Sequence, residues 1–434
     1  MARLFADTRP LRVHRAFRRM WFGQLVSGMG SQLTIVGVAY QTYRLTHSSF
    51  AVGLVSLAQL GPLLVGSLWG GSIADARDRR RLLLMTNVLM ATTSAGLAVN
   101  AGLGHPRLWP LFVCTAGSAG FQALDMPARR AALPMIVPPE DLPAALALQQ
   151  VLYQTALVVG PALAGLLIAR AGLGTVFSID VASFAAAFAS AWLLPPLVPR
   201  GGGTRAGLKS ITEGLRYLRG KRLIASTFWI DLAAMVFGMP RALFPALGTG
   251  LFHGGAGTVG LLYSAPGVGA LIGALLTGWV AQVRRQGRAV VAAVSVWGAA
   301  IAAFGAVPIL WVGLLLLAVA GAADVISAVF RNAIMQMTTP ERLQGRLSGT
   351  YFAVVTGGPR LGDLEAGGVA ALRDAQFSVV SGGVACLAGV ALVVWRVPEL
   401  WRHDAGARAG SAAAVDDQLL AALDDAAHEL GEGR

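Results

Sequence analysis

The sequence predicts an all-α membrane protein with twelve transmembrane helices in two pseudo-symmetric six-helix bundles. Three observations support this fold class: the composition, the spacing of the apolar runs and an internal repeat. Hydrophobic residues make up 55% of the chain and charged residues only 13%. Soluble domains carry roughly 25% charged residues. A chain this poor in charge is therefore expected to lie in a lipid bilayer.

Twelve apolar runs follow one another along the chain. They span residues 21–42, 50–74, 82–101, 108–127, 145–169, 175–195, 223–247, 257–281, 289–307, 309–334, 347–371 and 376–397. Each is about as long as the ~20 residues that an α-helix needs to cross ~30 Å of hydrocarbon. The runs lack the alternation of a membrane β-barrel, so helices remain as the way to satisfy the backbone. Residues 1–20 are basic and contain no apolar core, so no signal peptide is expected.

The basic residues predict the orientation of these helices, because short cytoplasmic connections collect Lys and Arg. The two chain ends and the connections after the second, fourth, sixth, eighth and tenth runs together hold twenty-nine Lys and Arg residues. This count assigns Arg331 to the connection after the tenth run. The other connections hold only four, which are Arg44, Arg107, Arg170 and Arg373. Both termini are therefore expected in the cytoplasm of a bacterial cell, with the chain in its inner membrane.

The same features argue against several other classes of protein. The net charge of +13 is spread over all the inner connections, so it indicates topology and no nucleic-acid partner. Cys114 and Cys386 lie in apolar runs and the six His residues share no metal spacing, so no disulfide framework or metal site is expected. The absence of a G-x-x-x-x-G-K-[ST] phosphate loop argues against an ATPase. We therefore expect no cofactor and no enzymatic activity.

An internal repeat relates the two halves of the chain. The segment "GGSIADARDRRR" (70–81) follows the second run, and "TGWVAQVRRQGR" (277–288) follows the eighth. Likewise "PPEDL" (138–142) after the fourth run matches "TPERL" (339–343) after the tenth. A duplicated six-helix unit explains both matches.

The repeat also predicts the domain boundaries. We expect an amino-terminal bundle (1–195), a cytoplasmic linker (196–222), a carboxy-terminal bundle (223–398) and a cytoplasmic tail (399–434). The linker is expected to form an amphipathic helix, since Leu208, Ile211, Leu215 and Leu218 share one helical face. The acidic tail is expected to be a solvated chain end.

The segment "GGSIADARDRRR" resembles a signature of the major facilitator superfamily, in which Asp follows Gly by four residues and precedes a basic cluster. Asp78 stands where that signature usually has Gly, and Gln282 replaces the Asp in the second copy. Four stretches are similar to the enterobactin-exporter group of that superfamily: "AYQTYRLTHSSFAVGL" (39–54), "RALFPALGTG" (241–250), "PGVGALIGALLTG" (266–278) and "TTPERLQGRLSG" (338–349). The resemblance covers both halves and leaves out the tail.

The resemblance implies alternating access, in which one bundle rocks on the other around a central site. It assigns an inner-gate motif to Gly71, Asp75, Arg79, Arg80 and Arg81. It further implies that Asp75 faces the start of the helix at 347–371, near Ser348 and Gly349, when the inner gate is closed. The alternative is a basic connection with incidental acidic residues.

A second motif lies in the fifth run. The stretch "VVGPALAG" contains Gly160, Pro161 and Gly165, and it is similar to the Gly-Pro stretch of the superfamily's antiporters. This similarity implies exchange of cargo against protons.

Ionisable residues inside apolar runs are functional candidates, because charge is costly in lipid. The candidates for proton coupling are Asp324, Glu365, Asp363, Asp231 and Asp180. Asp324 is the first choice and Glu365 the second. Asp324 leads because positions 320, 321, 327 and 328 hold no basic residue. Asp125 is expected to form a salt bridge with the neighbouring arginines instead.

The eleventh run contains "TGGPRLGDLEAGG" (356–368), which is expected to kink or break the helix. Arg360 and Asp363 are three residues apart and are predicted to pair on one helical face. Arg241 lies at a depth similar to that of Glu365 and is its candidate partner. A purely structural charge network is the alternative for these residues.

The sequence thus predicts a secondary exporter that moves a small amphipathic molecule, a siderophore or a drug-like compound, out of the cytoplasm by proton antiport. The expected partners are this cargo, protons and the lipid bilayer, and the protein is expected to be a monomer. The first alternative is an importer or facilitator of a polar metabolite, favoured by Gln24, Gln32, Gln149, Gln150 and Gln154. A membrane enzyme or receptor is the remote alternative, because no His-x-x-x-x-Asp pair occurs.

Overall fold

The computed structural model describes residues 7–198, 220–339, 341–402 and 404. The described residues form helices and connections and contain no β-strand. The predicted linker helix and the acidic tail fall on residues outside this description, so they stay predictions.

The helices follow the predicted apolar runs closely. In chain order they are α1 (Arg9–Val13), α2 (Arg15–Thr46), α3 (Ser49–Ala58), α4 (Leu60–Ala76), α5 (Arg79–Gly102), α6 (Trp109–Ile136), α7 (Leu142–Trp192), α9 (Arg222–Phe237), η1 (Arg241–Leu243), α10 (Phe244–Ala246), η2 (Leu247–Leu251), α11 (Ala256–Leu275), η3 (Thr277–Gln282), α12 (Gln286–Ala306), α13 (Leu310–Thr338), α14 (Glu341–Leu372), α15 (Ala375–Arg396) and α16 (Pro398–Arg402). Eight helical segments within the described residues are long and apolar enough to cross a membrane. The helices therefore agree with the predicted multi-pass fold.

The longest helix, α7, contains two of the predicted runs. Its 51 residues are interrupted at Gly172, where the backbone has a φ of 81°. Glycine adopts this left-handed conformation without the steric penalty that other residues carry. The chain reverses there, because Asp141 at one end contacts His14 and Trp192 at the other end contacts Arg80.

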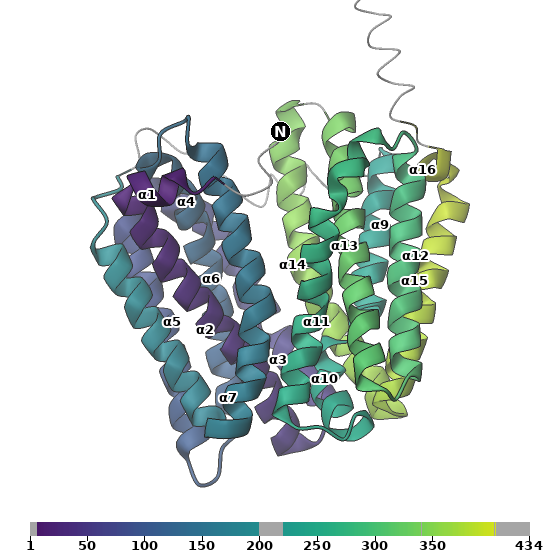
Figure 1. Ribbon diagram of the computed structural model, residues 1–434, viewed down its shortest axis with the longest axis horizontal. Helices are drawn as coiled ribbons and strands as arrows, with labels where there is room; N and C mark the ends of the chain where they lie inside the picture. The colour runs from purple at the N-terminus through teal and green to yellow at the C-terminus, as the bar shows by residue number, and fades with distance from the viewer. Residues whose placement is uncertain (1–6, 199–219, 340, 403, 405–434) are drawn as a thin grey trace, which may run out of the picture.

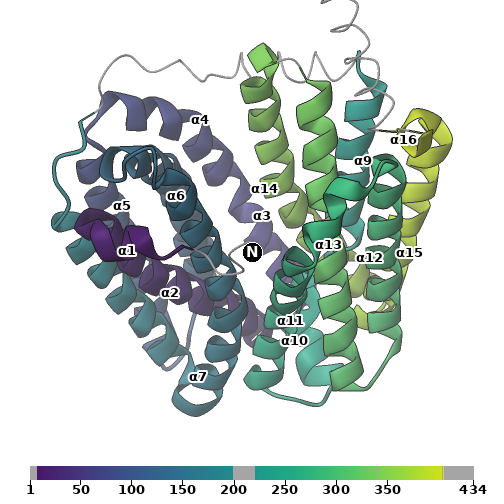
Figure 2. The same cartoon turned by 45° about the horizontal axis from the view of Figure 1, so that its top comes forward.

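The helices form two groups that lie side by side. In Figures 1 and 2, α1 to α7 make up one group and α9 to α16 the other. We call the end with the α4–α5 and α11–α12 junctions the basic end, because Arg79, Arg80, Arg284 and Arg285 lie there. The opposite end is called the far end. The two groups diverge toward the basic end and approach each other toward the far end (Figure 1).

Two helix crossings join the groups near the far end. In the first, α3 packs against α14, and the position of Gly53 has no room for a side chain because the backbone of Asp363 lies against it. In the second, α7 packs against α11, with Gly165 against Gly260. Small residues allow membrane helices to approach each other this closely.

At the basic end, several polar contacts of the α4–α5 junction join residues of the first group. The Asp78 carboxylate caps α5 by accepting from the backbone N–H of Arg80 at 3.0 Å, and it also accepts from the N–H of Leu197 at 3.0 Å. Arg79 donates to the carbonyl of Ala131 at 3.0 Å and Arg80 to that of Trp192 at 2.6 Å. The residue that departs from the superfamily signature, Asp78, therefore acts as a helix cap.

The seventh predicted run is not one continuous helix. Helix α9 ends at Phe237, and after Gly238 and Pro240 the chain continues as the short segments η1, α10 and η2. Proline lacks the N–H that a continuous helix would need. The carbonyl of Gly238 that the break leaves free accepts a hydrogen bond from the Trp297 indole at 2.7 Å.

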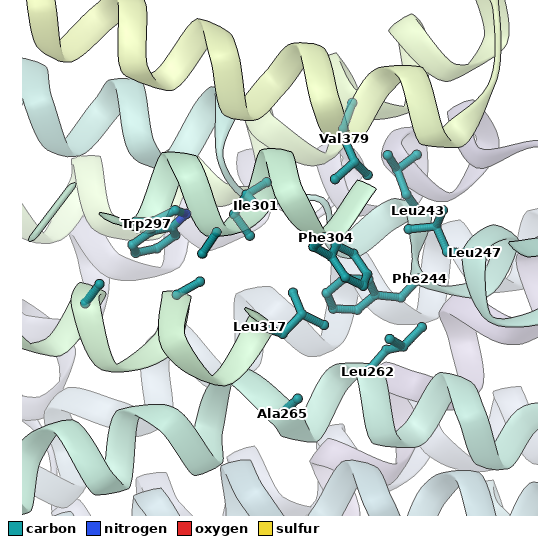
Figure 3. Close-up of a cluster of buried hydrophobic side chains, with 14 residues drawn as sticks. Leu243, Phe244, Leu247, Leu262, Ala265, Trp297, Ile301, Phe304, Leu317 and Val379 are labelled. Atoms are coloured by element: carbon teal, nitrogen blue, oxygen red, sulfur yellow. The ribbon is translucent and has the colours of Figure 1, made fainter. Parts of the chain in front are cut away.

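A buried apolar cluster anchors the second part of this broken segment. Phe244 lies edge-on to Tyr263 and to Phe304, with ring centroids 5.0 and 6.2 Å apart. Figure 3 shows Phe244 and Phe304 surrounded by Leu243, Leu247, Leu262, Leu317 and Val379. These side chains come from the broken segment, α11, α12, α13 and α15, so the packing fixes where the break lies.

Of the kink or break predicted in the eleventh run, the break does not occur. Helix α14 is continuous from Glu341 to Leu372 with Pro359 inside it. The guanidinium of Arg360 donates to the carbonyl of Thr356 at 2.6 Å and so satisfies an acceptor on the turn before it. The backbone break lies in the seventh segment instead.

Candidate transport site

The broken seventh segment directs a backbone donor at a carboxylate of α14. The N–H of Ala242 donates to Oδ1 of Asp363 at 3.0 Å. The first N–H groups of a helical segment have no partner within it, so they readily bind an anion. The other carboxylate oxygen, Oδ2, accepts from the Ser56 hydroxyl of α3 at 2.5 Å. Asp363 therefore bridges the two helix groups at the α3–α14 crossing.

The two predicted arginine pairs are not formed as direct contacts among the described residues. Arg360 lies beyond 4 Å from Asp363 and donates to its own helix, and Arg241 lies beyond 4 Å from Glu365. Arg241 instead acts through space on both Asp363 and Asp324. Its own carbonyl accepts from the Tyr263 hydroxyl at 2.9 Å. Arg360 also acts through space on Asp363, as its predicted place on the same helical face implies, although the two make no ion pair within 4 Å. Arg241 is placed in this region as predicted, and among the described residues it makes no ion pair with Glu365.

A cavity opens beside the break. It has a volume of about 80 Å³, is partly open to solvent, and reaches from α7 of the first group to α13 of the second. Its wall contains Arg241, Phe244, Tyr263, Trp297 and Asp324. The side chain of Asp324 is 35% exposed. None of the five glutamines predicted to serve a polar cargo lies in this wall. An apolar wall with a few polar groups is typical of sites for small organic molecules.

Behind the cavity wall, one arginine serves two carboxylates. Arg331 of α13 lies 2.8 Å from Asp231 of α9 and 3.9 Å from Asp324, measured between nitrogen and oxygen. It also contacts the hydroxyls of Ser327, at 3.0 Å, and Tyr351. Asp231 and Arg331 are 1% and 3% exposed, so the pair is sealed inside the bundle. Asp324 is the only one of the three charged groups that reaches the cavity.

The sequence analysis missed this cluster for two reasons. Arg331 was assigned to the connection after the tenth run, whereas it lies inside α13. The search for partners of Asp324 also stopped at the adjacent turn, although Arg331 is seven residues away and two turns along the same face. Positions 320, 321, 327 and 328 hold no basic residue, as stated, but Asp324 has a basic neighbour in Arg331. A search at a spacing of seven residues would have found the pair.

The remaining predicted carboxylates lie in separate places. Asp180 is buried in the first group, where its partners are hydroxyl groups. Glu365 is half-buried on α14 and has no ion pair within 4 Å among the described residues. Asp125 bonds to Arg129 and to the Thr86 hydroxyl, which agrees with the predicted salt bridge but puts it inside α6.

The motif residues are found at different ends of the molecule. Gly71 and Asp75 lie in α4, but the side chain of Asp75 is outside the described part, as are those of its predicted partners near Ser348. In the fifth run, Gly160 packs on Gln32 of α2, whereas the Pro161 carbonyl and Gly165 face Gly260 of α11. The Gly-Pro motif thus contributes to the second crossing between the groups.

Comparison with known proteins agrees with this architecture. A family model described as transmembrane secretion effector matches residues 6–425. The chain belongs to this family. It is one of the transporters of the major facilitator superfamily and not an enzyme.

The relatives and structural neighbours of this family member are transporters. The enterobactin exporter of Citrobacter koseri is 29% identical over 385 residues, covering 88% of this chain and 92% of that protein. The enterobactin exporter of Shigella boydii is 29% identical over 392 residues, covering 90% and 94%. A nucleoside transporter structure gives a TM-score of 0.72 at 11% identity, with 88% of this chain and 99% of that chain covered. A bacterial homologue of the iron transporter ferroportin, in an inward-facing state, gives 0.67 at 17%, covering 89% and 98%.

These findings identify the protein as a multi-pass membrane transporter of small-molecule cargo. The structural neighbours share the fold only, because their sequence identity is below 20%.

Proposed function

We propose that this protein is a secondary exporter that moves a small amphipathic molecule out of the bacterial cytoplasm in exchange for protons. The observation that carries the proposal is the cavity, in which an aromatic wall meets Asp324 and Arg241. The relatives named as enterobactin exporters support a siderophore as cargo, and a drug-like compound is the alternative.

The charge balance of the Arg331 cluster supports proton coupling. One guanidinium contacts two carboxylates, so these three groups carry one excess negative charge when both carboxylates are ionised. Arg241 on the same cavity wall acts on Asp324 more weakly than Arg331 and Asp231 do. Such an excess is unfavourable inside a membrane protein. Asp231 is sealed against Arg331, so the carboxylate that can exchange a proton with water is Asp324, on the cavity wall. We assign the coupling role to Asp324, with Asp231 and Arg331 as its charge partners.

The arrangement of the helices supports alternating access. The groups meet at the far end and diverge at the basic end, where the positive-inside rule puts the cytoplasm. In this assignment the structure is inward-facing, as the ferroportin homologue is. Both termini then lie in the cytoplasm. Cargo would enter the cavity from the basic end and leave after the α3–α14 and α7–α11 crossings separate.

The importer alternative is less well supported. A site for a sugar or another polar metabolite needs many hydrogen-bonding groups, whereas the cavity wall contains mainly apolar and aromatic side chains. An amphipathic cargo fits this wall better.

The test uses proteoliposomes with an acidic interior and enterobactin outside. We expect the wild-type protein to accumulate the siderophore as protons leave. Asp324→Asn is expected to abolish accumulation but to retain the exchange of labelled for unlabelled cargo without a gradient, because cargo binding does not need the proton. Asp374→Asn, which changes a carboxylate at the exposed start of α15, is the matched control and is expected to behave as wild type.

Accumulation by Asp324→Asn at the wild-type rate would contradict the coupling role. Accumulation in wild type only with an alkaline interior would contradict antiport. If neither the wild-type protein nor any variant exchanged enterobactin, the siderophore would no longer be the proposed cargo.

A further inference from the structure

Asp180 is a buried carboxylate that the proposed transport cycle does not use. It lies in the second part of α7, is 1% exposed, and faces α2 and α5. Neither Asp180 nor any of its hydroxyl partners lines the cavity, and the Arg331 cluster belongs to the other helix group, so Asp180 forms a separate site.

Hydroxyl groups are its only recorded partners among the described residues. Oδ2 accepts from the Thr34 hydroxyl of α2 at 2.6 Å and from the Ser94 hydroxyl of α5 at 2.7 Å. Oδ1 lies 3.2 Å from the hydroxyl of Ser183, one turn along α7. Gly30 of α2 closes the remaining side, since a Cβ there would collide with Asp180 Oδ1 and Ser183 Oγ.

No charged side chain from the packed helices reaches this carboxylate, and none acts on it through space. The charged residues of the three helices are Arg15, Arg18, Arg19 and Arg44 of α2, Arg79, Arg80 and Arg81 of α5, and Arg170 of α7. The arginines of α2 and α5 are at least ten residues from the nearest site residue of their own helix, which is about 15 Å along the axis. Arg170 lies before the reversal of α7 at Gly172, and Asp180 lies eight residues after it. An ionised Asp180 would therefore be a buried charge without a counterion.

The number of donor hydrogens around Asp180 indicates whether its carboxyl group is ionised or neutral. A serine hydroxyl has one hydrogen to donate. Ser183 lies closer to the backbone carbonyl of Asp180, at 2.7 Å, than to Oδ1, so its hydrogen belongs to the carbonyl. An ionised Oδ1 would then face a lone pair of Ser183. A protonated Oδ1 instead donates to Ser183 Oγ while Oδ2 keeps both of its donors, and every polar atom is satisfied.

A sodium ion fits this site poorly. The oxygen–oxygen separations of 2.6 and 2.7 Å are those of direct O–H···O hydrogen bonds. Ligands around an ion would have to stand farther apart. We propose that Asp180, together with Thr34, Ser94 and Ser183, is a proton-binding site that holds a resident proton at neutral pH in the conformation described.

The proposal can be tested by infrared spectroscopy of the full chain in lipid nanodiscs. The wild-type minus Asp180→Asn difference at neutral pH is expected to contain the C=O stretch of a neutral carboxylic acid. Thr34→Val removes one donor to that C=O, so the band is expected to move to higher wavenumber. The matched control is Thr42→Val on the same helix, also buried, which makes no contact with Asp180 and should leave the band in place.

Thermal unfolding provides a second measurement. The amide of Asp180→Asn can accept from Thr34 and Ser94 and donate to Ser183, so it mimics the protonated side chain. Its unfolding temperature is expected to match wild type, whereas Asp180→Ala should unfold at a lower temperature. A difference spectrum with carboxylate stretches and no acid C=O band would overturn the proposal, and so would a sodium-dependent rise in the wild-type unfolding temperature that Asp180→Asn abolishes. Neither result depends on what the protein transports.

Discussion

In the first helix group the carboxylate of Asp180 is held by three hydroxyl groups, whereas in the second group Asp231 and Asp324 face the guanidinium of Arg331. The two sites differ in the net charge that remains when their carboxylates are ionised. In our proposal the hydroxyl site is complete with one proton, and none of its residues lines the cavity. The arginine cluster keeps one unbalanced negative charge at a side chain that reaches the cavity. The comparison supports placing the proposed proton switch in the second group, whose Asp324 reaches the cavity.

The α3–α14 crossing joins a hydroxyl group of the first helix group to a carboxylate of the second. There a hydroxyl of the first group, Ser56, donates to a carboxylate of the second, Asp363. In the proposed transport cycle this contact breaks when the α3–α14 crossing separates. The opening of the far end is therefore expected to depend on the Asp363 carboxylate inside the membrane.

The largest expected effect comes from breaking the arginine cluster. Arg331→Met leaves Asp231 buried without its cation, which should lower the free energy of unfolding by about 3–5 kcal/mol. The double variant with Asp231→Leu removes both charges and should recover most of this loss. Thermal or denaturant unfolding in detergent measures both.

The control for this prediction is Arg373→Met, because Arg373 is exposed at the far end. It should leave stability unchanged. If Arg331→Met unfolded like this control, the second group would not depend on its arginine, and the comparison between the halves would fail.

A smaller effect is expected from the Ser56–Asp363 hydrogen bond at the α3–α14 crossing. Ser56→Ala removes one hydrogen bond to a charged group, which is worth about 1.5–3 kcal/mol. The equilibrium should shift by roughly ten- to a hundredfold toward separation of the far end. Spin labels at His105 and Leu372, one exposed on each group at the far end, should report longer distances.

Ser67→Ala is the matched control, since within the part of the chain that the structure describes the Ser67 hydroxyl donates to the carbonyl of Leu64 in its own helix. Both variants would be compared in a background without the two native cysteines. Identical distance distributions in the two variants would show that the Ser56–Asp363 bond does not hold the gate.

The smallest effect should come from a carboxylate outside the hydrocarbon. Asp78→Ala removes the cap of α5 and the bond to Leu197, so unfolding should become easier by about 1 kcal/mol. Glu140→Ala, at an exposed position of the same end, is the control. An effect of Asp78→Ala as large as that of Arg331→Met would mean that the basic end, and not the buried charge, limits stability.

The sequence by itself determined the fold class and the candidate carboxylates. Long apolar runs can satisfy their backbone in lipid only as helices, so composition and run length were sufficient to predict a helical membrane protein. The scarcity of charge in these runs also made each buried Asp or Glu stand out, and Asp324 and Asp363 both lie at the proposed transport site.

Tertiary structure alone decided the partners of these groups. Ser56 and Asp363 are 307 residues apart, and Asp231 and Arg331 are brought together by the packing of α9 on α13. Helix rotations set such contacts, and a local pattern of residues does not contain them. The break at Gly238–Pro240 likewise depends on the Trp297 indole, 59 residues away, which satisfies the carbonyl that the break exposes. Local residues could suggest where the helix weakens, but only packing could stabilise the broken form.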